Sequence, residues 1–225
     1  KMDFLGLRNL TVLDDAVKMV QQREPEFALS KIPDDDAETY DMISRGQTAG
    51  VFQIESTGMT GVCVGLKPQS IEDITAVIAL YRPGPMESIP RFIACKHDPK
   101  LVTYKHPRLV PILSVTYGCI VYQEQVIRIF QELGGFSLGQ ADMVRRAMSK
   151  KKLKDIQRER EAFVYGDAER GIKGCIANGI DEKTAQAIYD EIYDFANYAF
   201  NKAHAVSYAV VAYQTAYFKC HYTKE

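Results

Sequence analysis

The sequence contains no long apolar run. No stretch approaches the ~18–20 apolar residues of a membrane-spanning helix, and the first residues lack the basic segment and apolar run of an export signal. We therefore expect no membrane insertion, no membrane partner and no export. The chain starts at Lys1 without Met and stops at Glu225 soon after a strong helical pattern, so we expect both ends to have been cut from a longer protein.

Cysteine is sparse and widely scattered. The closest two of the five cysteines are 24 positions apart, and the set is Cys63, Cys95, Cys119, Cys175 and Cys220. This spacing fits neither a metal site nor a disulfide framework. A reducing cytoplasm is the simplest location to expect.

The formal net charge is only −1, because the chain has 28 Lys and Arg residues and 29 Asp and Glu residues. The 46% hydrophobic and 25% charged residues are typical of globular proteins, and 225 residues allow one large domain or two small ones. Any nucleic-acid footprint must therefore be a local patch. The motifs of self-contained enzymes are missing too, since the chain has no P-loop, Rossmann glycine pattern or hydrolase motif.

Helix signals dominate the sequence. Capping pairs stand before apolar residues at helical spacing in three places, Thr11 with Asp14, Ser70 with Asp73 and Ser137 with Gln140. Proline in Arg82-Pro83-Gly84-Pro85 stops one helix, and Gly134-Gly135 stops another. Extended backbone is predicted over 117–122 and a long helix over 205–222. The predicted fold is mostly α, with short irregular or extended segments.

Acidic residues carry no metal site by themselves. The cluster formed by Asp34, Asp35, Asp36, Glu38 and Asp41 indicates a helix start with a solvated face. Asp3 is typical of the end of a half-buried strand, but chemistry with two metal ions needs more than one carboxylate. Taken alone, Asp3 is an ordinary terminal carboxylate.

Positive charge gathers over residues 145–160, where eight cations face two acids, a local charge of +6. Such a density suits a polyanion, because each phosphate contact adds attraction and releases counterions. A solvated helix face paired to the chain's own acids is an equally good interpretation. Position favours the first, because Arg145 and Arg146 project from one capped helix and their planar forks match phosphate oxygens.

A second candidate is the stretch 198–204, predicted to be a loop between two helices. Its sequence Tyr-Ala-Phe-Asn-Lys-Ala-His brings aromatic, amide, ammonium and imidazole groups together. Lys202 could meet a phosphate as a point charge, and His204 could donate a hydrogen bond near neutral pH. The alternative for a lone histidine is a hydrogen-bonded core or capping residue.

Seven motifs, in this order, resemble the alpha subunit of bacterial DNA polymerase III, a C-family polymerase. They start with Lys1–Thr11, Gly50–Ser56 and Leu80–Met86, followed by Tyr117-Gly118 with Val121–Val126. Gly135–Asp142, Arg145–Met148 with Lys150-Lys151, and Phe200–Lys202 with His204 complete the series. The resemblance spans the whole chain. Met2, Ser149 and Thr223 depart from the common pattern, which affects loop geometry but removes no charged candidate.

The resemblance implies a fold and a catalytic centre. Residues 1–8 would end the palm strand that carries a catalytic aspartate, and residues 9–225 would form the helical fingers, with two possible subregions at 9–115 and 116–225. Asp3 matches the last of three aspartates that hold two Mg²⁺ ions in the intact polymerase. The other two, an Asp-x-Asp pair, are expected upstream, so the fragment alone is expected to be inactive and to bind no Mg²⁺.

The resemblance also implies partners and roles. Lys1, Arg145 and Arg146 match residues expected to contact the incoming deoxynucleoside triphosphate, and Lys202 and His204 fall in the motif that lines the same pocket. The resemblance assigns Arg82 to nucleotide binding less strongly, because Arg82 could instead stabilise the structure of its own loop. Lys150, Lys151 and Lys152 are expected to bind DNA.

The leading hypothesis is template-directed nucleotidyl transfer by the intact protein on a DNA template-primer, together with other replicase subunits. The alternatives are a non-catalytic helical module that grips nucleic-acid phosphates and a protein-interaction scaffold.

Overall fold

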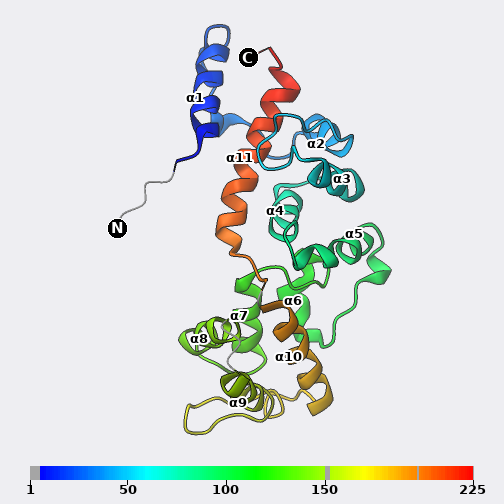
Figure 1. The fold of residues 1–225 in the computed structure, drawn as a ribbon, viewed down its shortest axis with the longest axis vertical. Helices are drawn as coiled ribbons and strands as arrows, with labels where there is room; N and C mark the ends of the chain where they lie inside the picture. Colours follow the sequence, from blue (N-terminus) through cyan, green and yellow to red (C-terminus); the bar gives the residue numbers. More distant parts are fainter. Residues whose placement is uncertain (1–5, 150–152, 197, 225) are drawn as a thin grey trace. The chain divides into compact units, whose positions relative to one another are not determined.

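The computed structural model describes residues 6–149, 153–196 and 198–224, which form helices joined by turns and short irregular segments (Figure 1). Within these residues extended backbone pairs at two isolated bridges, Tyr122 with Phe200 and Asp167 with Ile172. The predicted mostly α fold is confirmed.

The α-helices of the described residues are α1 (Arg8–Gln21), α2 (Ala37–Ser44), α3 (Thr57–Leu66), α4 (Ile71–Leu80), α5 (Ile89–His97), α6 (Val110–Leu113), α7 (Gln123–Glu132), α8 (Leu138–Ser149), α9 (Leu153–Tyr165), α10 (Glu182–Ala196) and α11 (Lys202–His221). Single 3₁₀ turns occupy Leu29–Lys31, Pro85–Ser88, Pro99–Leu101, Pro107–Leu109 and Ser114–Thr116. Proline stands at the start of three of these turns, where a missing N–H costs no helical hydrogen bond.

Side-chain caps start several helices as the sequence predicts. Before α8, Ser137 and Gln140 cap each other reciprocally: Ser137 Oγ accepts from the Gln140 N–H at 3.3 Å, and Gln140 Oε1 accepts from the Ser137 N–H at 2.8 Å. The prediction that Thr11 caps a helix is wrong, because α1 already begins at Arg8. Its N-cap residue is Leu7, which makes no side-chain hydrogen bond to the helix.

The acidic cluster does mark a helix start. Asp36 precedes α2 and accepts hydrogen bonds from Thr39 N at 2.9 Å and Thr39 Oγ1 at 2.6 Å. A short polar side chain at this position satisfies a backbone N–H that has no partner inside the helix. The prediction that this cluster marks the start of a helix is therefore confirmed, with Asp36 as the N-cap of α2.

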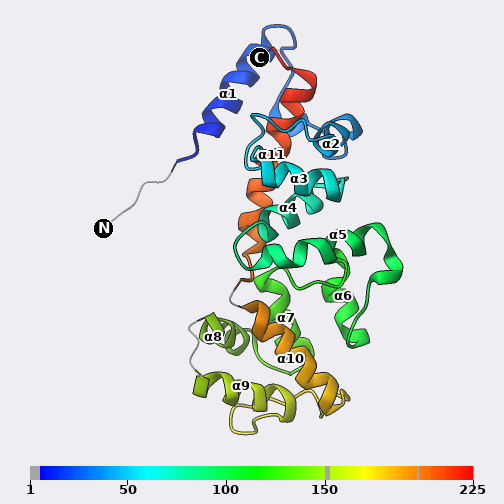
Figure 2. The same cartoon turned by 45° about the vertical axis from the view of Figure 1, so that its right-hand side comes forward.

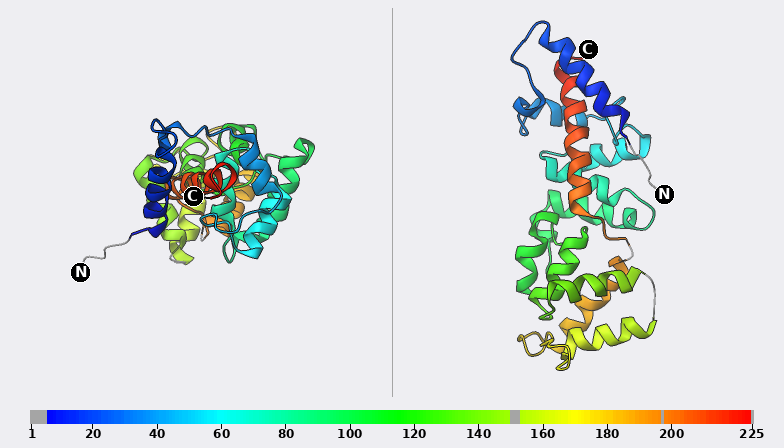
Figure 3. Two further views of the ribbon diagram at one scale, coloured as in Figure 1. Left: turned by 90° about the horizontal axis from the view of Figure 1, so that it is seen from above. Right: turned by 90° about the vertical axis from the view of Figure 1, so that its left-hand side faces the viewer.

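The described chain divides into two compact units, each with its own core. The first runs up to Ile78 and resumes at Ala203, and the second runs from Ala79 to Lys202. In the first unit, Leu13 and Val20 of α1 are buried with Phe218 of α11, and Figure 3 shows these two helices side by side. The subregions predicted at 9–115 and 116–225 stay a prediction.

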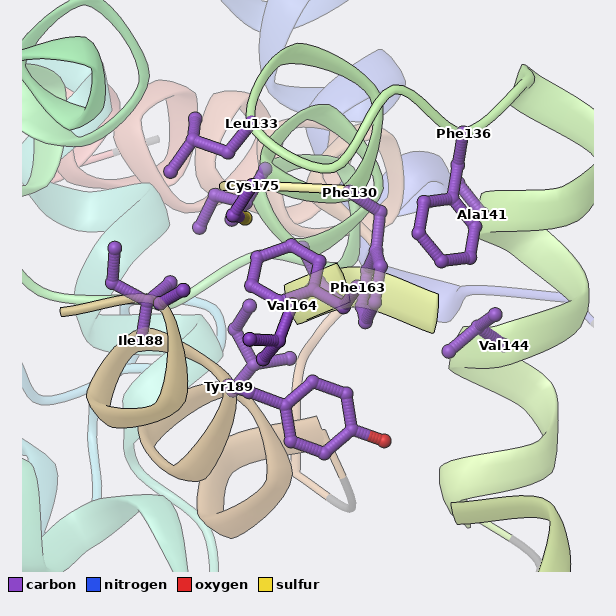
Figure 4. Close-up of a cluster of buried hydrophobic side chains, with 14 of the residues drawn as sticks. Phe130, Leu133, Phe136, Ala141, Val144, Phe163, Val164, Cys175, Ile188 and Tyr189 are labelled. Atoms are coloured by element: carbon purple, nitrogen blue, oxygen red, sulfur yellow. The ribbon is translucent and has the colours of Figure 1, made fainter. Parts of the chain in front are cut away.

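The second unit is centred on aromatic side chains of α7, α9 and α10. The rings of Phe130 and Phe163 meet edge to face with centroids 5.0 Å apart, and Tyr189 lies 5.8 Å from Phe163 (Figure 4). Helices α7, α8, α9 and α10 surround this core (Figures 1 and 2). The packing of these helices therefore supports α8, which carries the candidate residues Arg145 and Arg146.

No helix in the described part of the chain combines the length and the apolar character that crossing a membrane requires.

Candidate functional site

Several candidates fall outside the described residues. These are Lys1, Asp3, Lys150, Lys151 and Lys152. Their roles in nucleotide, metal and DNA binding stay predictions.

The stretch 198–202, which we call the Lys202 segment, is docked on the residues that lead into α7. Phe200 donates its N–H to Val121 O at 3.1 Å, and Gln123 N donates to Phe200 O at 2.9 Å. The Gln123 side chain adds a bond from Nε2 to Ala199 O at 2.9 Å. Two motifs that are far apart in the sequence are therefore joined through their backbones.

A buried glutamine fixes the backbone on which the Lys202 segment rests. Gln125 Oε1 accepts from Val121 N at 2.8 Å and from Tyr122 N at 2.9 Å, and its Nε2 donates to Thr116 Oγ1 at 2.7 Å. Gln125 is 5% exposed, so water does not compete for these hydrogen bonds. The extended backbone predicted over 117–122 is confirmed at its end, where Tyr122 pairs with Phe200, and is wrong at its start, where Tyr117 and Gly118 form a turn with φ of +52° and +81°.

Glu124 holds the far end of the Lys202 segment. Its carboxylate accepts from Asn201 Nδ2 at 3.0 Å and from the Lys202 backbone N–H at 3.0 and 3.2 Å. The ammonium group of Lys202 lies 5.4 Å from the centroid of the Tyr122 ring, within the range of a cation–π contact. Backbone and side chain of Lys202 therefore both contact residues at the start of α7.

Arg82 holds the near end of the same segment. Its Nη2 donates to Tyr198 O at 2.7 Å and its Nε to Ala79 O at 3.1 Å, while the guanidinium carbon lies 4.2 Å from the Phe200 ring centroid. Partial burial lowers the pKa of Arg82, but a guanidinium remains charged at neutral pH. These contacts give Arg82 a pinning role, and its contact with a nucleotide stays a prediction.

Gly84 brings the Arg82 loop close to Tyr198. Its φ is +102°, and a Cβ placed there would lie 2.4 Å from Tyr198 Cε1. Only glycine adopts this backbone conformation easily and leaves room for the ring. The Arg-Pro-Gly-Pro motif is therefore a packing surface for the Lys202 segment as well as a helix stop.

Arg145 and Arg146 share one carboxylate on their own helix. Asp142 Oδ1 accepts from Arg145 Nη2 at 2.8 Å, and Asp142 Oδ2 lies 2.8 Å from Arg146 Nε. The hydrogen bond from Arg145 lowers the pKa of Asp142, against an opposing effect of desolvation. The Arg146 side chain is 69% exposed and that of Arg145 only 17%.

The other described arginines of the basic cluster also have acidic neighbours. Arg160 Nη2 lies 3.0 Å from Asp190 Oδ1, and Arg158 Nη2 lies 3.9 Å from Asp167 Oδ2. The alternative of a helix face paired to the chain's own acids therefore describes these arginines. Exposed pairs of this kind contribute little energy, so a phosphate could replace the carboxylate.

His204 lies in the first unit, where its ring centroid is 4.3 Å from that of Tyr208. The predicted loop over 198–204 is wrong at its end, because α11 already begins at Lys202. Lys202 and Arg82 both belong to the second unit, where Arg82 contacts Tyr198 and Phe200 of the Lys202 segment. The convergence of Lys202 and His204 with Arg145 and Arg146 in a single cleft stays a prediction.

No role was predicted from the sequence for Glu124 or Asp142, although Glu124 lies in the motif Val121–Val126 and Asp142 ends the motif Gly135–Asp142. Asp142 stands three and four positions before the two arginines, a spacing that pairs charges on a helix. That signal could have predicted the pairing. Glu124 had no local signal, because its partners are 77 and 78 positions away.

One group of three possible metal ligands occurs among the described residues, formed by Asp36, Cys220 and His221 with ligand atoms within 4.8 Å of one another. Asp36 Oδ2 already accepts from Thr39 and lies 2.8 Å from His221 Nε2. These hydrogen bonds explain the group as a helix cap joined to the end of α11. Its thiol and imidazole do not suit Mg²⁺, which prefers oxygen ligands.

Comparison with known proteins gives one consistent result. The family model of the bacterial DNA polymerase III alpha subunit finger domain matches residues 9–171. DNA polymerase III subunit alpha of Halalkalibacterium halodurans is 51% identical over 223 residues, and that of Bacillus subtilis is 49% identical over 223 residues. Each alignment covers 99% of this chain and 19% of the relative.

A third relative, DNA polymerase III subunit alpha of Thermus aquaticus, is 48% identical over 231 residues, which cover 100% of this chain and 18% of the relative. The chain therefore spans less than a fifth of the length of the curated relatives it matches.

Proposed function

Because the chain belongs to the family of the bacterial DNA polymerase III alpha subunit finger domain, we propose that it binds the triphosphate of an incoming deoxynucleotide within a replicative polymerase. Lys202, Arg145 and Arg146 supply the cations, joined in the intact protein by Lys1 and His204. Several donors are needed, because a triphosphate carries about four negative charges. The observation that supports this best is the fixed placement of Lys202 between Glu124 and Tyr122.

The proposed reaction is template-directed nucleotidyl transfer. The primer 3′-hydroxyl attacks the α-phosphate of the nucleotide and pyrophosphate leaves. In this step the lysine and arginine side chains orient the phosphates and stabilise the negative charge that develops on them. Lys150, Lys151 and Lys152 contact the backbone of the template-primer, as expected for cations that track a polyanion.

Two Mg²⁺ ions in the intact polymerase would be held by Asp3 and two further aspartates of the longer protein. Bound there, the ions would activate the attacking hydroxyl and neutralise the phosphates. The described residues offer no set of carboxylates for this task, since their one candidate group contains Cys220 and His221. We propose that the isolated chain does not polymerise, and that the parent protein acts in the cytoplasm with other replicase subunits.

The test uses the intact polymerase with Arg145→Ala or Lys202→Ala. Loss of one charge-assisted phosphate contact should raise the KM for the nucleotide about 10- to 100-fold and change duplex affinity less than about 3-fold. Arg128→Ala is the matched control, because Arg128 is an exposed arginine of α7 paired with Glu132 at 2.8 Å.

The alternative is a non-catalytic module that grips nucleic acid, and the basic cluster over 145–160 is the observation that favours it. Such a module predicts the reverse pattern: Arg145→Ala would weaken duplex binding, with a shallower salt dependence, and leave nucleotide binding unchanged. If every variant binds nucleotide and duplex DNA as tightly as the wild type, both functions are contradicted and the protein-interaction scaffold is the hypothesis that remains.

A further inference from the structure

We propose that Glu124 is a positioning residue for nucleotide binding, acting through Lys202. The carboxylate accepts from the Lys202 backbone N–H and from the Asn201 side chain, and so fixes the residue that carries the ammonium group. The inference rests on the proposed function, in which that ammonium group meets the triphosphate. No substrate contact is assigned to Glu124 itself.

A carboxylate is well suited to this position. Lys202 is the first residue of α11, and the backbone N–H groups at the start of a helix have no acceptor inside the helix. An anion placed there also interacts favourably with the helix dipole. Glu124 therefore occupies the point at which a phosphate could otherwise bind the backbone, and the triphosphate is left to the side chain of Lys202.

Glu124 is also linked to the Lys202 ammonium group through the neighbouring residue Tyr122. Tyr122, whose ring lies 5.4 Å from Lys202 Nζ, is two residues before Glu124 on the backbone fixed by Gln125. Arg82 holds the opposite end of the segment at Tyr198 O. With both ends held, Lys202 can be displaced only if one of these attachments is broken.

Electrostatics alone predicts the opposite effect. Glu124 places a negative charge beside Lys202, and a like charge near a triphosphate weakens its binding. If Glu124 acted only through its charge, Glu124→Gln would tighten nucleotide binding. If it positions Lys202, the same change weakens binding, because the amide offers one acceptor oxygen and turns a donor toward the Lys202 N–H.

The experiment measures steady-state incorporation by the intact polymerase carrying Glu124→Gln. We expect the KM for the nucleotide to rise about tenfold, as for the loss of a charged hydrogen bond, with kcat changed less than about threefold. Glu132→Gln is the matched control on the same helix, where the carboxylate pairs with Arg128, and its KM should stay within about twofold. A KM that falls or does not change in Glu124→Gln would overturn the proposal.

A double-mutant cycle separates this inference from the proposed function. If Glu124 acts through Lys202, the Glu124→Gln/Lys202→Ala double variant should have the same KM as Lys202→Ala alone. Additive effects would overturn the positioning role and leave the nucleotide site intact. An unchanged KM in Lys202→Ala would instead remove Lys202 from the proposed function.

Two further measurements exclude general misfolding. Glu124→Asp keeps the charge but shortens the reach, so its KM should lie between those of the wild type and Glu124→Gln. In the 225-residue chain, NMR hydrogen exchange of the Lys202 amide should accelerate in Glu124→Gln while amides of α10 keep their protection. Equal acceleration throughout α10 and α11 would show a structural role and overturn the proposal.

Discussion

Arg145 and Lys202 are cations of the same unit, yet they are held in different ways. The partner of Arg145 is Asp142, three positions earlier on the same helix, whereas the backbone of Lys202 is held by Glu124, 78 positions away. The first arrangement is a local side-chain pair that phosphate could replace. The second fixes the backbone of a whole segment, and the Lys202 ammonium group lies 5.4 Å from the centroid of the Tyr122 ring.

This comparison predicts that changes around the Lys202 segment cost more than changes around Arg145. The backbone bonds at Val121 and Phe200 and the two attachments at Arg82 and Glu124 support each other. Contacts that share partners are not independent. The pairs on α8, in contrast, join residues of a single helix, and water and ions compete for the Arg146 side chain, which is 69% exposed, more than for that of Arg145, which is 17% exposed.

The largest effect is expected from Gly84→Ala. The new methyl group would meet the Tyr198 ring at 2.4 Å, on a backbone with φ of +102°. We expect the free energy of unfolding to fall by about 2–4 kcal/mol, since strain and overpacking act together. Urea denaturation of the chain measures this loss. Gly171→Ala is the control, because its φ is +70° with nothing within 4 Å, and an equal loss there would contradict the role of the ring.

Arg82→Lys should have the next largest effect. A lysine cannot form both hydrogen bonds, to Tyr198 O and Ala79 O, while stacking on Phe200. We expect a loss of about 1–3 kcal/mol in unfolding free energy and faster hydrogen exchange at the Phe200 amide. Arg128→Lys provides the control on an exposed pair. Full stability in Arg82→Lys would mean that charge alone is sufficient at this position.

The sequence predicted local features well and distant ones poorly. Ser137 and Gln140 start α8 as expected, because a capping box depends on residues only three positions apart. Lys202 was expected in a loop, but Glu124 supplies a distant acceptor at the first residue of α11. Glu124 received no role for the same reason. Distant hydrogen bonds leave no periodic pattern in one sequence, so only the fold reveals them.

Asp142→Asn should act in the opposite direction to Glu124→Gln. It removes the carboxylate that pairs with Arg145 and Arg146, so nucleotide binding should become about 2- to 5-fold tighter, in proportion to the modest energy of a partly exposed ion pair. The measurement is the KM of the intact polymerase. Two acid-to-amide changes in one unit thus give opposite signs. Weaker binding in Asp142→Asn would show that Asp142 positions the arginines as Glu124 positions Lys202.

The smallest effect is the pH dependence of the Asp142 pair. The hydrogen bond from Arg145 lowers the pKa of Asp142 below its ordinary value of 3.8. A carboxyl whose pKa is lower in the folded chain stabilises the fold fully above its unfolded pKa, and this contribution is lost as the pH falls through the folded pKa. The wild type should therefore exceed Asp142→Asn in stability by a constant amount of under about 1 kcal/mol above pH ~5. Urea denaturation at successively lower pH should show this difference shrinking below pH ~4, and an unchanged difference there would mean that the pair contributes nothing through its charge.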